Sequence, residues 1–325
     1  MKILVTGVSG FIGMHLAQAL VQKGHDVTGV VRYATSRNNE ELKPFLKGVK
    51  LLTADISDYQ AISGALKMAN PDVVVHLAAM SPVRESFDRP FGFVEANVTG
   101  TLNIVHAMME LPEWKKRKLI YASTAEVYGP QDKPPLHEKM TLNPYSPYAV
   151  TKEMTDIYLR NIANNVYGLN TTVMRCTNSY GRKMETGFFV EYCISALLKG
   201  EKVYVGAPES VRDYMYIDDH VNAYLKAIEH KDVRGEAFSF GTGKGISNKD
   251  CALLIADMMG FDKKHVVIGE YPPTYPSRPL VSDQPFIVMD YSKAKKMLGW
   301  EPKVDLKHGL KLSIDYWKKK MGKAA

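Results

Sequence analysis

Residues 2–13 read Lys-Ile-Leu-Val-Thr-Gly-Val-Ser-Gly-Phe-Ile-Gly, and this stretch decides the fold of the N-terminal half. The apolar run Lys2–Thr6 predicts a β-strand, and the apolar residues after it have helical spacing. Between strand and helix, Gly7, Gly10 and Gly13 form the pattern GxxGxxG. Glycines in this context permit a tight turn, close approach of backbone N–H groups to phosphate, and close packing of helix on strand. The stretch therefore predicts a turn that holds the pyrophosphate of a dinucleotide at the positive end of a helix.

Short apolar strands and amphipathic helices continue to alternate through the first half of the chain. Continuous apolar strands separated by helices are typical of a parallel sheet covered on both faces. We therefore expect an α/β fold with a doubly wound parallel sheet of the Rossmann type. The predicted strands are Lys2–Thr6, Val27–Val31, Val49–Thr53, Val73–His76, Leu119–Ala122 and Thr171–Arg175, and the predicted helices are Phe11–Gln22, Val98–Met109 and Tyr148–Asn164.

After about residue 176 the pattern changes to turns rich in proline and glycine, with fewer regular strands. We place a dinucleotide-binding Rossmann domain at residues 1–175. A smaller C-terminal α/β lobe, residues 176–325, is expected to bind the substrate, with some chain crossing back to the Rossmann sheet.

Composition and charge exclude several classes of protein. With 45% hydrophobic and 24% charged residues, the chain has a globular composition, and its net charge of +7 favours anionic partners. The densest basic runs, Lys115–Lys118 and Lys318–Lys320, are short for a nucleic-acid-binding arm, and no apolar stretch approaches the ~18 residues of a membrane span. The isolated Cys176, Cys193 and Cys251 offer neither a disulfide framework nor a metal site. We expect a cytoplasmic protein without metal that binds a small molecule rather than nucleic acid or membrane.

The end of the second strand informs on the cofactor. An acidic residue there would bind the ribose hydroxyl of NAD, whereas a basic residue favours the 2′-phosphate of NADP. The sequence has Arg32 at this point, so NADP is favoured over NAD, with a surface cation as the alternative. Asp55 ends the third strand and could accept the adenine amino group, and Asn97 opens a helix. Either residue could instead be a cap or turn residue.

Tyr148 and Lys152 lie four residues apart and so share one face of a predicted helix. A neighbouring ammonium, together with the charge of an oxidised nicotinamide, favours the phenolate, which makes Tyr148 a candidate general base. The pattern alone is common on amphipathic helices, but Thr124 follows a predicted strand and lies where α/β sites form. Thr124 could bond the same substrate hydroxyl, although a simple turn at the strand end is the alternative.

In combination these segments resemble the extended short-chain dehydrogenase/reductases that act on nucleotide sugars, the epimerase and dehydratase group. The resemblance covers nearly the whole chain. It rests on Gly7–Gly13, Asp55-Ile56, His76–Ala79, Asn97–Thr101, the Thr124 segment, Tyr148 with Lys152, Asn178, Arg212–Tyr214 and Leu298–Pro302. The cofactor contacts that it implies, together with those above, are Gly7, Gly10, Phe11, Ile12, Gly13, Arg32, Asp55, Ile56, Leu77, Ala78, Ala79, Asn97, Tyr148 and Lys152.

The resemblance also implies a shared first step. Tyr148 and Thr124 assist removal of the proton from the 4-hydroxyl of the sugar while hydride passes to the nicotinamide, which gives a 4-keto sugar. Epimerases return the hydride to the other face. The 4,6-dehydratases instead remove the proton at carbon 5, expel the 6-hydroxyl as water and deliver hydride to carbon 6.

Glu126 is the most informative residue for the choice between these reactions, because a carboxylate after the catalytic threonine resembles the carbon-5 base of dehydratases, and simple 4-epimerases usually lack it. The alternatives are that Glu126 faces solvent or caps a turn, and some decarboxylases and reductases of the group also carry glutamate there. Arg32 and the segment Met80–Phe87 look most like GDP-mannose 4,6-dehydratases, which use NADP. Ala125 departs from that family, which has serine there, so Glu126 would also have to protonate the departing hydroxyl. A UDP-hexose 4-epimerase with bound NAD and a 4-keto-sugar reductase are the alternatives. A dinucleotide sensor without activity is a fourth reading, against which Thr124, Tyr148 and Lys152 together argue.

The substrate implied is a nucleotide-diphosphate sugar. Ser81 would contact the sugar and Asn178 the sugar phosphate, while Arg212 and Arg278 would meet the diphosphate as planar cations. Arg212 beside Asp213 could instead be a structural ion pair. Relatives dimerise through the helices that match Val98–Met109 and Tyr148–Asn164, so the resemblance implies a homodimer or homotetramer.

Overall fold

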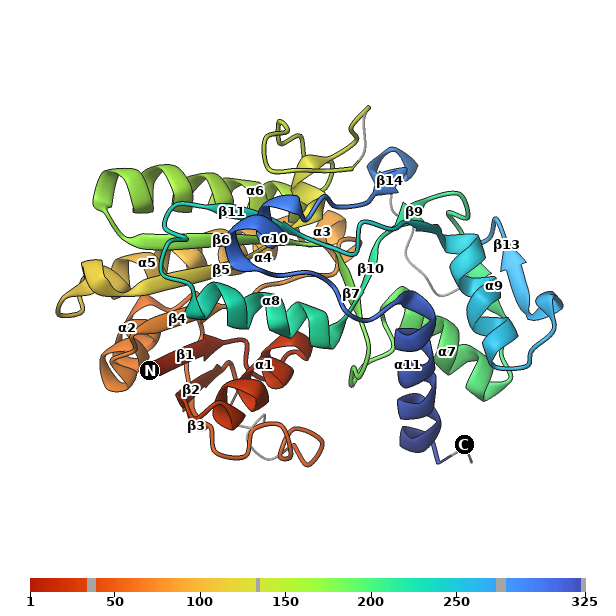
Figure 1. Cartoon of the computed structure of the whole chain (residues 1–325), viewed down its shortest axis with the longest axis horizontal. Helices are drawn as coiled ribbons and strands as arrows, with labels where there is room; N and C mark the ends of the chain where they lie inside the picture. The colour runs from red at the N-terminus through yellow and green to blue at the C-terminus, as the bar shows by residue number, and fades with distance from the viewer. Residues whose placement is uncertain (34–38, 133–134, 273–278, 323–325) are drawn as a thin grey trace.

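The computed structural model describes residues 1–33, 39–132, 135–272 and 279–322. Seven strands form one parallel sheet in the order β11-β6-β5-β4-β1-β2-β3 (Figure 1). The strands are β1 (Lys2–Thr6), β2 (Asp26–Val31), β3 (Lys50–Thr53), β4 (Val73–His76), β5 (Lys118–Thr124), β6 (Asn170–Cys176) and β11 (Ala237–Phe240). The predicted doubly wound parallel sheet is confirmed.

Each strand of this sheet contributes to two hydrophobic cores, because successive side chains point to opposite faces. Ile3 and Val5 pack in the core that includes α1 (Phe11–Gln22) and α8 (Ile217–Glu229). Leu4 packs in the other core, with α2 (Tyr59–Ala69) and α5 (Gly100–Met109). Helices therefore cover both faces, which explains why the strands are apolar throughout.

Local sequence signals set the ends of the helix that carries Tyr148 and Lys152. This helix, α6 (Pro147–Ile157), begins after Ser146, whose hydroxyl accepts from the N–H of Ala149 at 3.1 Å, and has proline at its first position. It continues as a π-helix, η5 (Tyr158–Tyr167), which ends at the left-handed Gly168. A π-helical turn, η2 (Val94–Thr99), likewise precedes α5. Both predicted helical runs exist, but each contains a π segment.

The chain after residue 176 contributes α8 and β11 to the sheet layer, where α8 packs against α1 and β11 pairs with β6. Of the remaining elements, α10 packs against β11, while α7, α9 and α11 gather beside the sheet on the right of Figure 1. These other elements are β7 (Asn178–Tyr180), α7 (Phe189–Lys199), β8 (Val203–Val205), β9 (Val211–Arg212), β10 (Tyr214–Tyr216), β12 (Ile246–Ser247), α9 (Asn248–Met258), β13 (Val266–Ile268), β14 (Phe286–Ile287), α10 (Ser292–Leu298) and α11 (Leu306–Lys320). Short helical turns complete the chain: α3 (Glu85–Asp88), α4 (Pro90–Phe93), η3 (Trp114–Lys116), η4 (Ala125–Tyr128), η6 (Lys263–His265) and η7 (Leu280–Ser282).

Cys176, Cys193 and Cys251 are free thiols in the interior. Across the described residues, no cluster of three His, Cys, Asp or Glu side chains is arranged to hold a metal ion. The same part of the chain contains no helix with both the length and the apolar character of a membrane span.

Candidate active site

A cavity of about 530 Å³ opens where the carboxyl ends of β1, β4, β5 and β6 meet the C-terminal lobe. This is the edge at which open parallel sheets bind ligands. The structure brings most of the predicted site residues together here. Those that line the cavity are Gly7, Gly10, Phe11, Ile12, Gly13, Arg32, Asp55, Ile56, Leu77, Ala78, Ala79, Ser81, Thr124, Glu126, Tyr148, Lys152 and Asn178.

The glycine turn leaves no room for side chains. Gly7 has a φ of +67°, and a Cβ atom on it would lie 2.8 Å from the backbone nitrogen of Ala78. A Cβ on Gly13 would lie 2.2 Å from the carbonyl oxygen of Gly7. No described side chain caps the N-terminus of α1 after Gly10, so the first N–H groups of the helix face the cavity side of the turn. These features fit the pyrophosphate of a dinucleotide.

Arg32 and Asp55, which the sequence assigns to different parts of the cofactor, form an ion pair. The Arg32 Nε lies 2.9 Å from the Asp55 Oδ2. Partial burial raises the pKa of Asp55, but the N–H of Ser57 and the Arg32 guanidinium outweigh it and hold the pKa below its ordinary value. Asp55 is thus ionised at neutral pH and offsets part of the Arg32 charge.

Asn97 does not line the cavity but holds a segment that does. Its Oδ1 accepts from the N–H of Met80 at 2.8 Å, and its Nδ2 donates to the Met80 carbonyl at 3.0 Å and to the Thr151 hydroxyl at 3.0 Å. Asn97 therefore ties the loop after β4 to α6. Direct contact between Asn97 and the cofactor stays a prediction.

His76 supports the site; the sequence reasoning named it within the segment His76–Ala79 but gave it no role. Its Nδ1 is hydrogen-bonded to the Thr6 hydroxyl at 2.8 Å and its Nε2 to the Thr101 hydroxyl at 3.1 Å. The Thr6 hydroxyl also accepts from the N–H of Ala78 at 3.1 Å. Burial, helped by the charge of Lys152, lowers the pKa of His76 to about 3, so the ring is neutral. A histidine ending a buried strand was the available signal.

Thr124, Tyr148 and Lys152 are all buried and meet at the end of β5. Burial raises the pKa of Tyr148, and its hydrogen bond with Thr124 opposes this only in part. Burial lowers the pKa of Lys152 to about 7, and the ammonium donates to the Ala122 carbonyl at 2.8 Å. The sequence expectation that lysine favours the tyrosine phenolate is therefore not met by the protein alone. The positive charge of an oxidised nicotinamide would act in the expected direction.

Glu126 lies in η4, directly after the catalytic strand, and its N–H donates to the Thr124 hydroxyl at 3.2 Å. Gln284 holds it from the C-terminal lobe: the Gln284 Nε2 donates to the Glu126 carbonyl at 3.0 Å and to the carboxylate Oε2 at 3.1 Å. Gln284 belongs to no motif, so sequence reasoning had no signal for it. Ala125 also lines the cavity and offers only a methyl group.

The substrate-side predictions have different outcomes. Ser81 and Asn178 line the cavity, whereas Arg212 does not: its Nη2 lies 2.6 Å from the Asp283 Oδ1, and its Nη1 donates to the Gln284 carbonyl at 2.7 Å. Contact between Arg212 and a diphosphate stays a prediction, and Arg278 lies outside the described residues.

The alternative prediction was that Arg212 forms an ion pair with Asp213. The structure pairs Arg212 with Asp283 instead. The Asp213 carboxylate accepts from the N–H groups of Thr242 at 2.8 Å and Gly243 at 3.1 Å. Successive side chains of an extended chain point in opposite directions, so neighbours in sequence take separate partners.

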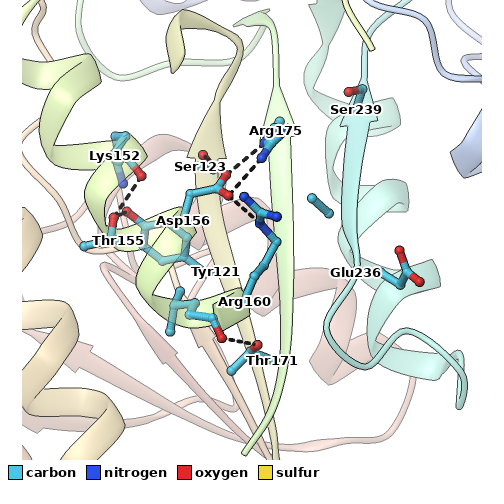
Figure 2. Close-up of polar contacts among 12 residues, drawn as sticks. Tyr121, Ser123, Lys152, Thr155, Asp156, Arg160, Thr171, Arg175, Glu236 and Ser239 are labelled. Carbon is cyan, nitrogen blue, oxygen red and sulfur yellow. Dashed lines mark hydrogen bonds and ion pairs between the residues drawn. The ribbon is translucent and has the colours of Figure 1, made fainter. Parts of the chain in front are cut away.

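A buried ion cluster attaches the catalytic helix to the sheet (Figure 2). Asp156, one turn after Lys152, accepts from the Arg175 Nε at 2.8 Å, the Arg160 Nε at 2.8 Å and the Ser123 hydroxyl at 3.0 Å. Burial alone would raise the pKa of Asp156, but Arg175 and Arg160 hold it below its ordinary value. Because Ser123 directly precedes Thr124, the cluster positions α6 relative to the end of β5.

Comparison with known proteins agrees with this geometry. A family model described as GDP-mannose 4,6 dehydratase matches residues 4–312. The chain belongs to this family. The predicted membership in the nucleotide-sugar epimerase and dehydratase group of the extended short-chain dehydrogenase/reductases is thereby confirmed.

Individual relatives of this family member include both epimerases and dehydratases. UDP-glucuronate 4-epimerase of Thermodesulfobacterium geofontis is 30% identical over 97% of this chain and 95% of its own. The structure of UDP-glucose 4-epimerase from Thermotoga maritima with UDP-glucose is 33% identical, with a TM-score of 0.88 over 99% of this chain and 100% of the other. The dTDP-glucose 4,6-dehydratase from Streptomyces venezuelae, solved with NAD, is 25% identical, with a TM-score of 0.87 over 99% and 98%. The class and a nicotinamide nucleotide cofactor follow, but not the choice of reaction.

Proposed function

We propose that the protein is a nucleotide-sugar 4,6-dehydratase with a GDP-mannose-like substrate, working through a 4-keto intermediate with a bound NADP. The observation that carries the proposal is Glu126, whose carboxylate lines the same cavity as Thr124 and Tyr148 and is held by Gln284. A 4-epimerase has no need of a second base near the sugar ring, whereas elimination of water requires one.

The first step needs a base for the 4-hydroxyl of the sugar. Tyr148 takes this proton, and the Thr124 hydroxyl orients the same oxygen. A bound nicotinamide nucleotide supplies a reversible hydride acceptor for this chemistry. Lys152 secures α6 to the end of β5 through the Ala122 carbonyl and contributes a titratable cation to the same cavity as Tyr148.

The second step uses the acidity that the ketone gives to carbon 5. Glu126 takes the carbon-5 proton, the electron pair forms the carbon 5–carbon 6 double bond, and the bond from carbon 6 to its hydroxyl breaks. Ala125 has no proton to give, so Glu126 passes the proton that it holds to the departing hydroxide, and water leaves. The carboxylate is thereby regenerated. Return of the hydride to carbon 6 and addition of a solvent-derived proton at carbon 5 would then give the 4-keto-6-deoxy sugar and restore the oxidised cofactor.

The proposed preference for NADP over NAD rests on Arg32. Arg32 lines the cavity and could bind a 2′-phosphate, but its ion pair with Asp55 already offsets part of its positive charge. A UDP-hexose 4-epimerase with bound NAD is the second candidate function, favoured by Ala125 and by the similarity to solved epimerases. A 4-keto-sugar reductase is the third.

Reaction in D₂O tests the proposal. The holoenzyme is incubated with GDP-mannose, dTDP-glucose and UDP-glucose, and products are analysed by NMR and mass spectrometry. We expect a 4-keto-6-deoxy sugar with deuterium at carbon 5. Glu126→Gln should slow this exchange at least about 100-fold. An epimer without solvent deuterium, or net consumption of NADPH, would establish one of the alternatives instead.

We also propose a cytoplasmic homodimer or homotetramer in which residues 1–175 bind the dinucleotide and residues 176–325 bind the nucleotide sugar. Val150, Met154 and Ile157 are exposed apolar side chains on α6, in support of an interface there. The free cysteines are compatible with a reducing compartment.

A further inference from the structure

Two polar atoms on α8 are buried beside the cavity without a nitrogen or oxygen hydrogen-bond partner among the described residues: the Nε2 of His220 and the hydroxyl of Tyr224. The Tyr224 hydroxyl meets only the thiol of Cys176 among these groups, and a thiol is a weak hydrogen-bonding group. Both residues line the cavity. They lie four apart, on one face of the helix, and their rings stack with centroids 5.4 Å apart at an angle of 17°. A buried polar group without a good partner destabilises the fold, so two such groups in one wall indicate that a ligand forms hydrogen bonds with them.

Both groups are neutral at physiological pH. Burial, with the charge of Lys183 nearby, lowers the pKa of His220 to about 3, and burial raises that of Tyr224. The His220 Nδ1 is hydrogen-bonded to the Ser179 hydroxyl, which can itself donate to the Thr177 carbonyl 3.5 Å away. With Nδ1 as the donor to Ser179, the Nε2 is an acceptor, while the Tyr224 hydroxyl is a donor.

This wall belongs to the end of the cavity where the chemistry takes place. Tyr224 adjoins the Cys176 thiol at the end of β6, and its electrostatic neighbours include Tyr148. The helix itself packs against β5 and β6. The glycine turn that fits the pyrophosphate lies elsewhere in the same cavity, so the part of the dinucleotide that reaches Tyr148 also reaches this wall.

We propose that His220 and Tyr224 form the binding site for the carboxamide group of the nicotinamide. The Tyr224 hydroxyl donates to the carboxamide oxygen, and the His220 Nε2 accepts from its N–H. A primary amide presents an acceptor and a donor on one small group, which matches a donor and an acceptor one helical turn apart. The assignment goes beyond the proposed function, since it holds for a dehydratase, an epimerase or a reductase alike.

The proposal makes an unusual prediction about stability. Replacing an unsatisfied buried hydroxyl by an apolar group of the same shape is neutral or stabilising. Tyr224→Phe should therefore leave the melting temperature of the cofactor-free protein unchanged or raise it, while reducing the rise that the dinucleotide produces. A hydroxyl retained for folding, or for binding a buried water, would behave in the opposite way.

Binding measurements on the cofactor-free full chain complete the test. Calorimetry is done with the preferred dinucleotide, with its 3-acetylpyridine analogue, and with the matching ADP-ribose compound that lacks nicotinamide. Tyr224→Phe should weaken the dinucleotide about tenfold and leave the ADP-ribose compound within about twofold. His220→Phe should remove the preference for carboxamide over acetylpyridine.

Tyr180→Phe is the matched control, because Tyr180 also lines the cavity but its hydroxyl donates to the Leu306 carbonyl at 3.3 Å. Tyr180→Phe should not change the ratio of the affinity for the dinucleotide to the affinity for the ADP-ribose compound. Equal losses for dinucleotide and ADP-ribose compound in Tyr224→Phe would overturn the assignment. A lower melting temperature with both affinities intact would do so too, and would assign the hydroxyl to a water site.

Discussion

At the scale of single residues, burial decides the charge of Lys152. Burial lowers its pKa to about 7, whereas a lysine in the unfolded chain titrates near 10.4. Between about pH 7 and 10 the unfolded state therefore binds more protons than the folded state. Since the free energy of unfolding rises with pH wherever this is so, Lys152 makes the protein more stable as pH increases through this window.

The comparison of wild type with Lys152→Met isolates this effect, because all other titrations cancel in the difference. We expect the free energy of unfolding of wild type, minus that of Lys152→Met, to rise from pH 6.5 to 9.5. It is measured by urea unfolding of the cofactor-free proteins at constant ionic strength. The slope should approach about 1.4 kcal/mol per pH unit at its steepest. A difference that is constant, or that falls with pH, would show that the ammonium is not destabilised in the fold.

Residue pairings across long stretches of chain are what the sequence could not supply. The glycine turn, Thr124, Tyr148 and Lys152 are local patterns, and the structure brings all of them to one cavity. Gln284, by contrast, reaches Glu126 across 158 positions. Only the folded chain decides such contacts, because they depend on how β14 is placed and not on spacing.

At the scale of elements, too, local patterns could be predicted from the sequence and long-range pairings could not. The helix Phe11–Gln22 and the positions of the first six sheet strands along the chain could be predicted from periodicity, because each has its own apolar pattern. The seventh strand, β11, was missed: its four residues pair with β6 only after α8 has crossed back to the sheet. Short strands far along the chain carry little pattern of their own, and tertiary pairing selects them.

One buried lysine terminates α8, the helix that carries His220 and Tyr224. The Lys118 Nζ donates to the carbonyls of Ala227 at 3.1 Å, Ile228 at 3.1 Å and His230 at 2.6 Å. Carbonyls at a helix end have no partners within the helix, and a cation there also suits the helix dipole. We expect Lys118→Met to lower the free energy of unfolding by about 2–3 kcal/mol in urea titration.

Lys50→Met is the control for this change, since Lys50 is 72% exposed and paired only at the surface with Asp26. Lys50→Met should lower the free energy of unfolding by less than about 1 kcal/mol. Equal effects of the two substitutions would mean that Lys118 contributes no more than a surface charge. The cost should be confined to stability, because Lys118 lies at the opposite end of β5 from Thr124.

At the scale of the whole molecule, the site is shared between the two halves of the chain. The segment after β5 that carries Glu126 contributes Val127 and Leu136 to a small hydrophobic cluster. Ile287 and Met289, from far along the chain, complete this cluster. Side chains from both sides of the proposed division at residue 175 also line the same cavity. A substrate bound between the halves would contact both.

The exposed face of α6 extends this reasoning to the assembly. Val150, Met154 and Ile157 are 50%, 52% and 39% exposed and follow helical spacing, so they form one apolar stripe on the back of the catalytic helix. Such a stripe is typical of an interface between copies of a chain.

We expect the wild-type protein to sediment as a dimer or tetramer. Met154→Arg should raise the dissociation constant of this assembly at least about 100-fold, because it buries an unpaired charge. Leu312→Arg, at a similarly exposed apolar position on α11, should leave the assembly intact. A wild-type monomer at micromolar concentration, or equal responses to the two arginines, would place the interface elsewhere and leave the stripe on α6 as ordinary surface.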